Sequence, residues 1–225
     1  MILALAEMAG AGTITGTVRA VGKPGTAGDP NCGDAYKQSR ALKFVEVKNY
    51  EDEHEFVVFI VGPVGGQPVR SNQPVQAVTT RKVSQRGASF SPHILPVLVG
   101  TTVEWPNFDD IFHNVFSMSE SKPFDLDLYK GNPPEKRVRF DKPGRVDVFC
   151  SIHSQMSCVV LVLENPYFAL TDAKGRYTIS QVPPGTYKLK AWYERLPAQE
   201  LEIVVPESGE TRADFTLGVK NLPKY

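Results

Sequence analysis

The stretch Phe149-Cys150-Ser151-Ile152-His153-Ser154-Gln155-Met156, together with the earlier His113, decides how this chain folds. Just before it, apolar side chains recur at every second position from Val146 to Cys150, which predicts a strand with Cys150 facing inward. The apolar run at 158–163 predicts a second, buried strand. The sequence therefore predicts a short loop that joins two strands and carries Cys, His and Met at intervals of three.

The spacing of these residues indicates a metal site. One His, followed 37 residues later by Cys-x2-His-x2-Met, supplies two imidazoles, one thiolate and one thioether. This is the donor set of blue-copper electron-transfer sites, in which the thioether is a weak axial ligand. Zinc is the main competitor, but structural zinc sites prefer four Cys or His ligands. The pattern therefore favours copper.

Further features extend on both sides of the pattern, between residues 90 and 163. They are Phe90-Ser91-Pro92, residues 99–105 (VGTTVEW), Asn107, residues 113–117 (HNVFS), Lys142-Pro143-Gly144 and the Cys150 loop. In this order they resemble a cupredoxin with a short, amicyanin-like ligand loop. The resemblance implies a Greek-key β-sandwich over residues 74–164 that binds one mononuclear type 1 copper ion through His113, Cys150, His153 and Met156. It also implies that Asn114 donates its backbone N–H to the thiolate and ties the two ligand loops together with its side chain.

A second set of patterns lies towards the two ends of the chain. It comprises a G-x-V strand at 12–19, an apolar run at 56–61, a hairpin with a Gly turn at 171–179 and a PPGTY segment within 182–191. These segments resemble a carboxypeptidase regulatory-like domain, a smaller β-sandwich of the transthyretin type. We therefore predict that residues 12–72 and 165–225 form one domain that the cupredoxin interrupts. Two domains in tandem order are the alternative.

Composition agrees with an all-β protein of two modest domains. The chain has 225 residues, of which 41% are hydrophobic, and alternating apolar and polar residues recur without a long helical period. Segments 22–44 and 62–88 lack clear periodicity and predict long loops. The formal net charge is zero, which gives no electrostatic argument for a nucleic-acid partner.

Several features bear on the compartment. No segment is long and apolar enough to predict a transmembrane helix. The first twelve residues resemble the tail of a truncated signal peptide, with a frayed N-terminus as the alternative. If Cys150 binds metal, Cys32 and Cys158 remain either as a disulfide pair or as two free thiols. Because blue-copper carriers usually work outside the reducing cytosol, we expect a periplasmic or extracellular protein.

The remaining histidines and acidic residues have simpler interpretations. His93 is read as a structural histidine, because no ligand position is vacant, and His54 as part of a solvated acidic loop. Five acidic residues cluster in sequence around the first ligand, and they either steer a cationic partner or keep a surface hydrated: Asp109, Asp110, Glu120, Asp125 and Asp127.

The resemblance implies a carrier that passes single electrons between redox proteins such as a c-type cytochrome or an oxidoreductase. His153 would be the port for the electron, with Ile152 and Phe112 in an apolar docking patch. The alternatives are a copper-storage protein and a catalytic red-copper variant, and Met156 argues against the second. The chain has no P-loop, dinucleotide fingerprint or HExxH motif, so we expect no enzymatic activity of its own.

Overall fold

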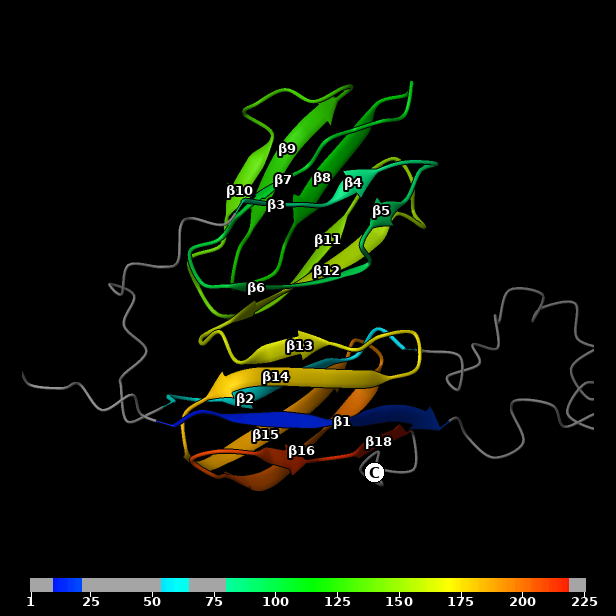
Figure 1. Ribbon diagram of the computed structural model, residues 1–225. Coiled ribbons are helices and arrows are strands. Elements are labelled where there is room, and N and C mark those ends of the chain that lie inside the picture. The colour runs from blue at the N-terminus through cyan, green and yellow to red at the C-terminus, as the bar shows by residue number, and fades with distance from the viewer. Residues whose placement is uncertain (1–9, 22–53, 65–79, 219–225) are drawn as a thin grey trace, which may run out of the picture. The chain divides into compact units, whose positions relative to one another are not determined.

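In the computed structural model, residues 10–21, 54–64 and 80–218 are described, and every regular element in these ranges is a β-strand (Figure 1). The predicted all-β class is confirmed. Within the same ranges no helix is long and apolar enough to cross a membrane. Two predictions fall outside the described residues: the loop at 22–44, which includes Cys32, and most of the signal-like segment.

The chain divides into two compact units. The described residues of Met1–Val61 and Tyr167–Tyr225 form the first unit, and those of Gly62–Pro166 form the second. These bounds differ from the predicted 74–164 at both ends, because residues 62–64, 165 and 166 group with the second unit. Asn165 accounts for part of this difference, since its side-chain amide donates to the carbonyl of Gly62 at 2.9 Å.

The first unit contains two four-stranded sheets. One sheet has the order β14-β1-β17, with β18 also paired to β1, and the other has the order β13-β2-β15-β16. The strands are β1 (Gly12–Val21), β2 (Val57–Val61), β13 (Phe168–Leu170), β14 (Arg176–Val182), β15 (Gly185–Tyr193), β16 (Leu196–Val205), β17 (Glu210–Arg212) and β18 (Phe215–Gly218).

Strand β1 joins segments that are far apart in sequence. It pairs antiparallel with β14 and parallel with both β17 and β18, all of which follow the second unit in the chain. Alternate side chains of β1, including Ile14 and Val18, are buried, as expected for a strand with one face on the core.

The chain leaves the first unit after β2 and returns beside it, because β13 pairs with β2. Adjacent exit and entry points of this kind let one unit interrupt another without separating the strands of its sheets.

The second unit is built from a five-stranded sheet, β6-β12-β11-β8-β9, a three-stranded sheet, β10-β7-β3, and the two-stranded pair β4-β5. Its strands are β3 (Thr80–Lys82), β4 (Ser84–Gln85), β5 (Phe90–Ser91), β6 (Ile94–Leu98), β7 (Thr102–Glu104), β8 (His113–Ser117), β9 (Phe124–Tyr129), β10 (Arg137–Arg139), β11 (Gly144–Phe149) and β12 (Ser157–Leu163). The prediction of one long loop at 62–88 is therefore wrong for β3 and β4. These strands are too short to show a period in the sequence, and they form by pairing with β7 and β5.

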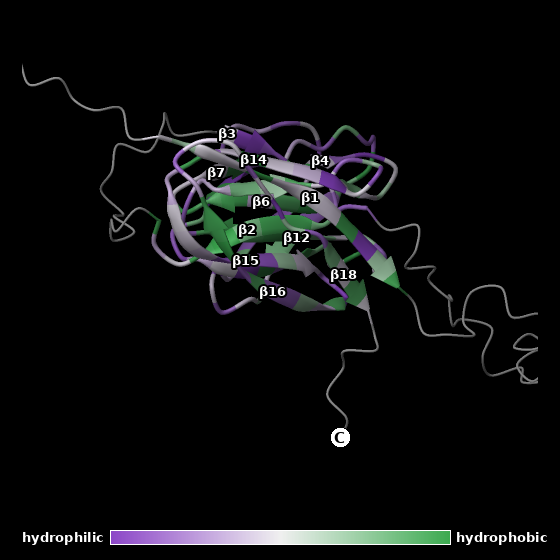
Figure 2. Ribbon diagram, turned by 60° about the horizontal axis from the view of Figure 1, so that its bottom comes forward, coloured by the Kyte–Doolittle hydropathy of each residue, from purple (hydrophilic) through white to green (hydrophobic). Residues whose placement is uncertain are grey.

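The core of the second unit lies around Trp105, which is fully buried. Its ring meets Phe90 edge-on, with centroids 5.8 Å apart, and lies 6.2 Å from Phe124. Strand β12 is buried along almost its whole length, and Figure 2 shows it as one of the most hydrophobic strands. Val146 and Val148 of β11 point into the same core, so the next position on that face, Cys150, also lies inside.

Candidate metal centre

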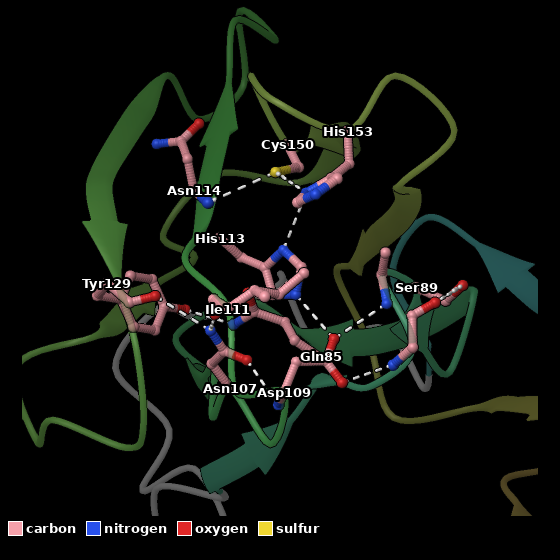
Figure 3. Close-up of polar contacts among 12 residues, drawn as sticks. Gln85, Ser89, Asn107, Asp109, Ile111, His113, Asn114, Tyr129, Cys150 and His153 are labelled. Carbon is pink, nitrogen blue, oxygen red and sulfur yellow. Dashed lines mark hydrogen bonds and ion pairs between the residues drawn. The ribbon is translucent and has the colours of Figure 1, made fainter.

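Three metal-ligating side chains converge at one end of the five-stranded sheet (Figure 3). His113 begins β8 and is fully buried, Cys150 directly follows β11 and is 5% exposed, and His153 is half-buried in the loop after it. Nδ1 of His113 lies 3.1 Å from Nδ1 of His153, and Sγ of Cys150 lies 3.6 Å from the same His153 atom. Across the described ranges this is the one cluster of three such residues, with donor atoms within 4.8 Å of one another.

The hairpin between β11 and β12 shapes the loop that carries two of these residues. Phe149 pairs with Ser157 across the hairpin, so residues 150–156 form the connection. The backbone N–H of Cys150 donates to the carbonyl of Met156 at 3.1 Å, and the N–H of Met156 donates to the carbonyl of His153 at 3.0 Å. These two bonds hold the three residues at fixed spacing. Met156 is 1% exposed and belongs to the same buried cluster as Cys150.

Asn114 connects the two ligand segments. Its backbone N–H donates to Sγ of Cys150 at 3.5 Å, and its side-chain oxygen accepts from the N–H of Ser151 at 3.3 Å. Its amide also donates to the carboxylate of Asp125 at 2.6 Å. Asn114 thus ties β8 to the Cys150 loop through both its backbone and its side chain.

A carboxylate lies on the other side of the first histidine. Nε2 of His113 is 2.7 Å from Oδ2 of Asp109, whose carboxylate also accepts from the N–H groups of Gly87 and Ala88. The pKa of Asp109 is lowered to about 2, mainly because its carboxylate accepts a hydrogen bond from the backbone N–H of Ala88. The backbone N–H of Gly87 and the ring of His113 lower this pKa further. This contact was not predicted, because Asp109 is one of five acidic residues spread over 109–127 and nothing in the sequence distinguishes it by type. Its spacing of four from His113 was the available signal.

Asn107 shapes the loop between Asp109 and His113. Its side-chain amide donates to the carbonyls of Ile111 and Tyr129, at 2.9 and 3.0 Å, and its oxygen accepts from the N–H of Asp109. Tyr129 lies beside His113 in the β8–β9 pairing, and burial is the main cause that raises the pKa of its hydroxyl far above 10. The Asn107 side chain thus ties the backbone of this loop to the carbonyl of Tyr129 in β9.

The remaining candidates lie outside the cluster. The ring of His93 lies with Nδ1 3.1 Å from the carbonyl of Ser157, a contact to the backbone of β12. His54 lies in the first unit, where its carbonyl accepts from the hydroxyl of Thr171. Asp110 forms a surface ion pair with Lys130 at 2.8 Å.

Two of the donor distances, those that involve Nδ1 of His153, fit a single metal ion. Zinc bonds set the scale, with about 2.0–2.1 Å to nitrogen and 2.3 Å to sulfur, so two donors on one ion lie at most about 4.4 Å apart. The observed distances of 3.1 and 3.6 Å are within this limit. Two imidazoles with a thiolate, and a buried methionine at the end of the same loop, form the donor chemistry that suits copper.

Apolar side chains adjoin the ligands in sequence and are about half exposed; they are Phe108, Ile111, Phe112 and Ile152. Cations lie over two of the rings, with Arg86 5.2 Å from the ring centre of Phe108 and Lys130 5.6 Å from that of Phe112. Exposed apolar side chains therefore lie near the ligands in sequence, and one of the two cations over their rings, Lys130, is paired with Asp110.

Comparison with known proteins gives a family match in one part of the chain. Residues 158–218 match the model of the carboxypeptidase regulatory-like domain, which confirms that prediction for the region. The match begins within β12, whereas the structure begins the returning part of the first unit at Tyr167. No curated protein matches the chain.

Similar solved structures include two of the cupredoxin class and one enzyme. A purple cupredoxin from Nitrosopumilus maritimus is 26% identical, with a TM-score of 0.32 over 37% of this chain and 99% of that one. A reduced amicyanin mutant is also 26% identical, with a TM-score of 0.33 over 37% of this chain and 82% of that one. A Cu-containing nitrite reductase from Thermus scotoductus SA-01 is 30% identical, with a TM-score of 0.37 over 44% of this chain. The match spans only 26% of that enzyme.

Proposed function

We propose that the Gly62–Pro166 unit is a type 1 copper protein that carries single electrons between redox partners and is not an enzyme by itself. The observation that carries the proposal is the buried cluster of His113, Cys150 and His153, with the N–H of Asn114 directed at the sulfur. When bound, the copper would supply the one-electron couple. His113, Cys150 and His153 would hold it, with Met156 as the weak fourth ligand.

The surroundings of the cluster support an electron carrier because they hold the donors still. Fast electron transfer requires that the ligands keep nearly one arrangement in both oxidation states. The backbone bonds of the 150–156 loop, the two side-chain bonds of Asn114 and the full burial of His113 all restrict movement. Burial of Cys150 and Met156 also excludes water from the donor side of the loop.

His153 is the proposed port for the electron. It is the most exposed of the three clustered residues, and its neighbour Ile152 is 52% exposed. Ile152 and Phe112 offer apolar surface on which a redox protein can dock, such as a c-type cytochrome or an oxidoreductase. We propose a periplasmic or extracellular location, where such carriers work.

Voltammetry of the copper-loaded chain tests this function, with a copper-retention assay against a chelator beside it. A reversible one-electron couple with copper retained in both oxidation states is the expected result. Rapid loss of copper to the chelator, with no reversible couple, would instead favour the storage protein. Turnover of nitrite, or another substrate of copper enzymes, by the isolated chain would overturn the statement that it is not an enzyme.

A further inference from the structure

The contact between Asp109 and His113 gives the carboxylate a role in the metal centre. We infer that Asp109 is a positioning residue, which holds the ring of His113 with Nε2–H towards its own carboxylate and with Nδ1 towards Cys150 and His153. The inference rests on the proposed function, because it concerns how one ligand of that site is oriented.

The geometry determines which nitrogen of His113 carries the hydrogen. Nε2 lies 2.7 Å from Oδ2 of Asp109, and an ionised carboxylate only accepts hydrogen bonds. The hydrogen of the neutral ring therefore lies on Nε2, which leaves the lone pair of Nδ1 facing His153 Nδ1 at 3.1 Å. Only a nitrogen without hydrogen can bind a metal, so the carboxylate selects the tautomer that the site needs.

The carboxylate is itself fixed by a second segment of the chain. The turn between β4 and β5 donates two backbone N–H groups to it, from Gly87 at 2.7 Å and from Ala88 at 3.0 Å. Both residues have a positive φ, 59° for Gly87 and 52° for Ala88, and residues other than glycine rarely adopt this backbone conformation. The backbone N–H of Asp109 also donates to Asn107. The acceptor for His113 is thus held independently of His113.

The buried ring has little freedom to find another arrangement. The His113 side chain is fully buried and that of Asp109 is 15% exposed, so water competes weakly for their contact. Turning the ring over would break the 2.7 Å bond and direct a C–H at the carboxylate. A carboxylate on the far side of a ligating imidazole also fixes the orientation of its ring, and its negative charge favours the more highly charged oxidation state of a bound metal.

A turn-forming aspartate with no role at the metal centre is the competing explanation. It predicts that removing the charge lowers stability but leaves the copper properties unchanged. Asp109→Asn separates the two explanations, because the amide is isosteric but has only one acceptor end for Gly87, Ala88 and His113. Asp110→Asn is the matched control, since Asp110 is adjacent and equally charged, but it is fully exposed and pairs with Lys130.

The first readout is the copper chemistry of the loaded full-length chain. For Asp109→Asn we expect about 10–100-fold weaker Cu(II) binding, the usual effect of removing such a partner. A tenfold greater loss for Cu(II) than for Cu(I) corresponds to a rise of about 59 mV in the one-electron reduction potential. Asp110→Asn should change neither quantity appreciably. Equal values for the wild type and Asp109→Asn would overturn the inference.

The second readout needs neither copper nor a variant, so it remains decisive if Asp109→Asn fails to fold. Two-dimensional ¹H–¹⁵N NMR of the metal-free wild-type chain reports the tautomer of His113 directly. The expected result is a slowly exchanging hydrogen on Nε2, and a hydrogen on Nδ1 would overturn the inference. If the wild type bound no copper but showed this tautomer, the proposed function would fail while the positioning by Asp109 would stand.

Discussion

Replacement of Gly16 by alanine tests the pairing of the chain's two ends most sharply. A Cβ at this position of β1 would lie 1.8 Å from the carbonyl oxygen of Ala213 and 2.9 Å from the ring of Tyr177. The backbone at Gly16 does not require a positive φ. In open space, Gly16→Ala would therefore stabilise the protein by about 0.4–1 kcal/mol, because alanine restricts the unfolded chain. The contacts around Gly16 predict instead that Gly16→Ala lowers the stability of the protein.

The size of the loss follows from what must move. An ordinary carbon contact needs about 3.5 Å, so the backbone at Ala213 must shift by more than an ångström, and overpacking of this kind costs about 1–3 kcal/mol. The shift also takes away the acceptor of the buried Tyr177 hydroxyl, now 2.6 Å from that carbonyl, which costs about 1–3 kcal/mol more. We therefore expect a loss of about 2–6 kcal/mol for Gly16→Ala, a large part of a typical domain stability.

Urea unfolding measures this loss in one unit at a time. The chain has two tryptophans, Trp192 in the first unit and Trp105 in the second, so a Trp105→Phe background leaves Trp192 as the sole reporter. Gly209→Ala is the comparison variant, because nothing lies within 4 Å of its Cβ and only its positive φ opposes the change. A stabilised Gly16→Ala variant, or one no weaker than Gly209→Ala, would refute the reasoning.

Three further predictions concern the ligand segments, one ion pair and the bound metal. Asn114→Ala removes the bonds to Ser151 and Asp125 but keeps the N–H directed at sulfur, so chemical unfolding should show a loss of about 1–3 kcal/mol without loss of the copper absorption. Asp172 has its pKa lowered from 3.8 to about 2, chiefly by the side chain of Arg176, so its stabilisation is complete above 3.8 and lost as the pH falls towards 2. The difference in melting temperature between the wild type and Asp172→Asn should accordingly shrink over that pH range, and a constant difference would contradict the assignment. Copper at 100 times its dissociation constant should stabilise the Gly62–Pro166 unit by about 2.7 kcal/mol, seen in calorimetry as a shift of that unit's transition alone.

Local patterns in the sequence indicated how Cys150 and His153, two of the three clustered residues, are placed. The period of two before Cys150 indicated the inward direction of its side chain, because a strand has only two faces. The spacing of three between Cys150, His153 and Met156 indicated that one loop holds them. Both features depend on neighbours in the chain, and the structure shows the loop closed by backbone bonds between these residues.

The features that the sequence did not reveal depend on contacts between distant segments. The partners of Asp109 come from the turn at Gly87 and Ala88, and no local pattern relates that turn to His113. The strands β3 and β4 were likewise missed, since two or three residues carry no period and their pairing comes from other strands. The parallel pairing of β1 with β17 and β18 also has no local signature, because any period-two strand is compatible with either direction.

The visible absorption and EPR spectra of the Cu(II)-loaded protein test the central claim most directly. They should be recorded for the wild type, for Cys150→Ser and for Cys158→Ser, which changes the other buried cysteine of the unit. The proposed site predicts intense blue absorption with narrow copper hyperfine splitting, lost in Cys150→Ser and kept in Cys158→Ser. A pale wild-type spectrum, or a colour that survives Cys150→Ser, would contradict the assignment of a type 1 copper centre.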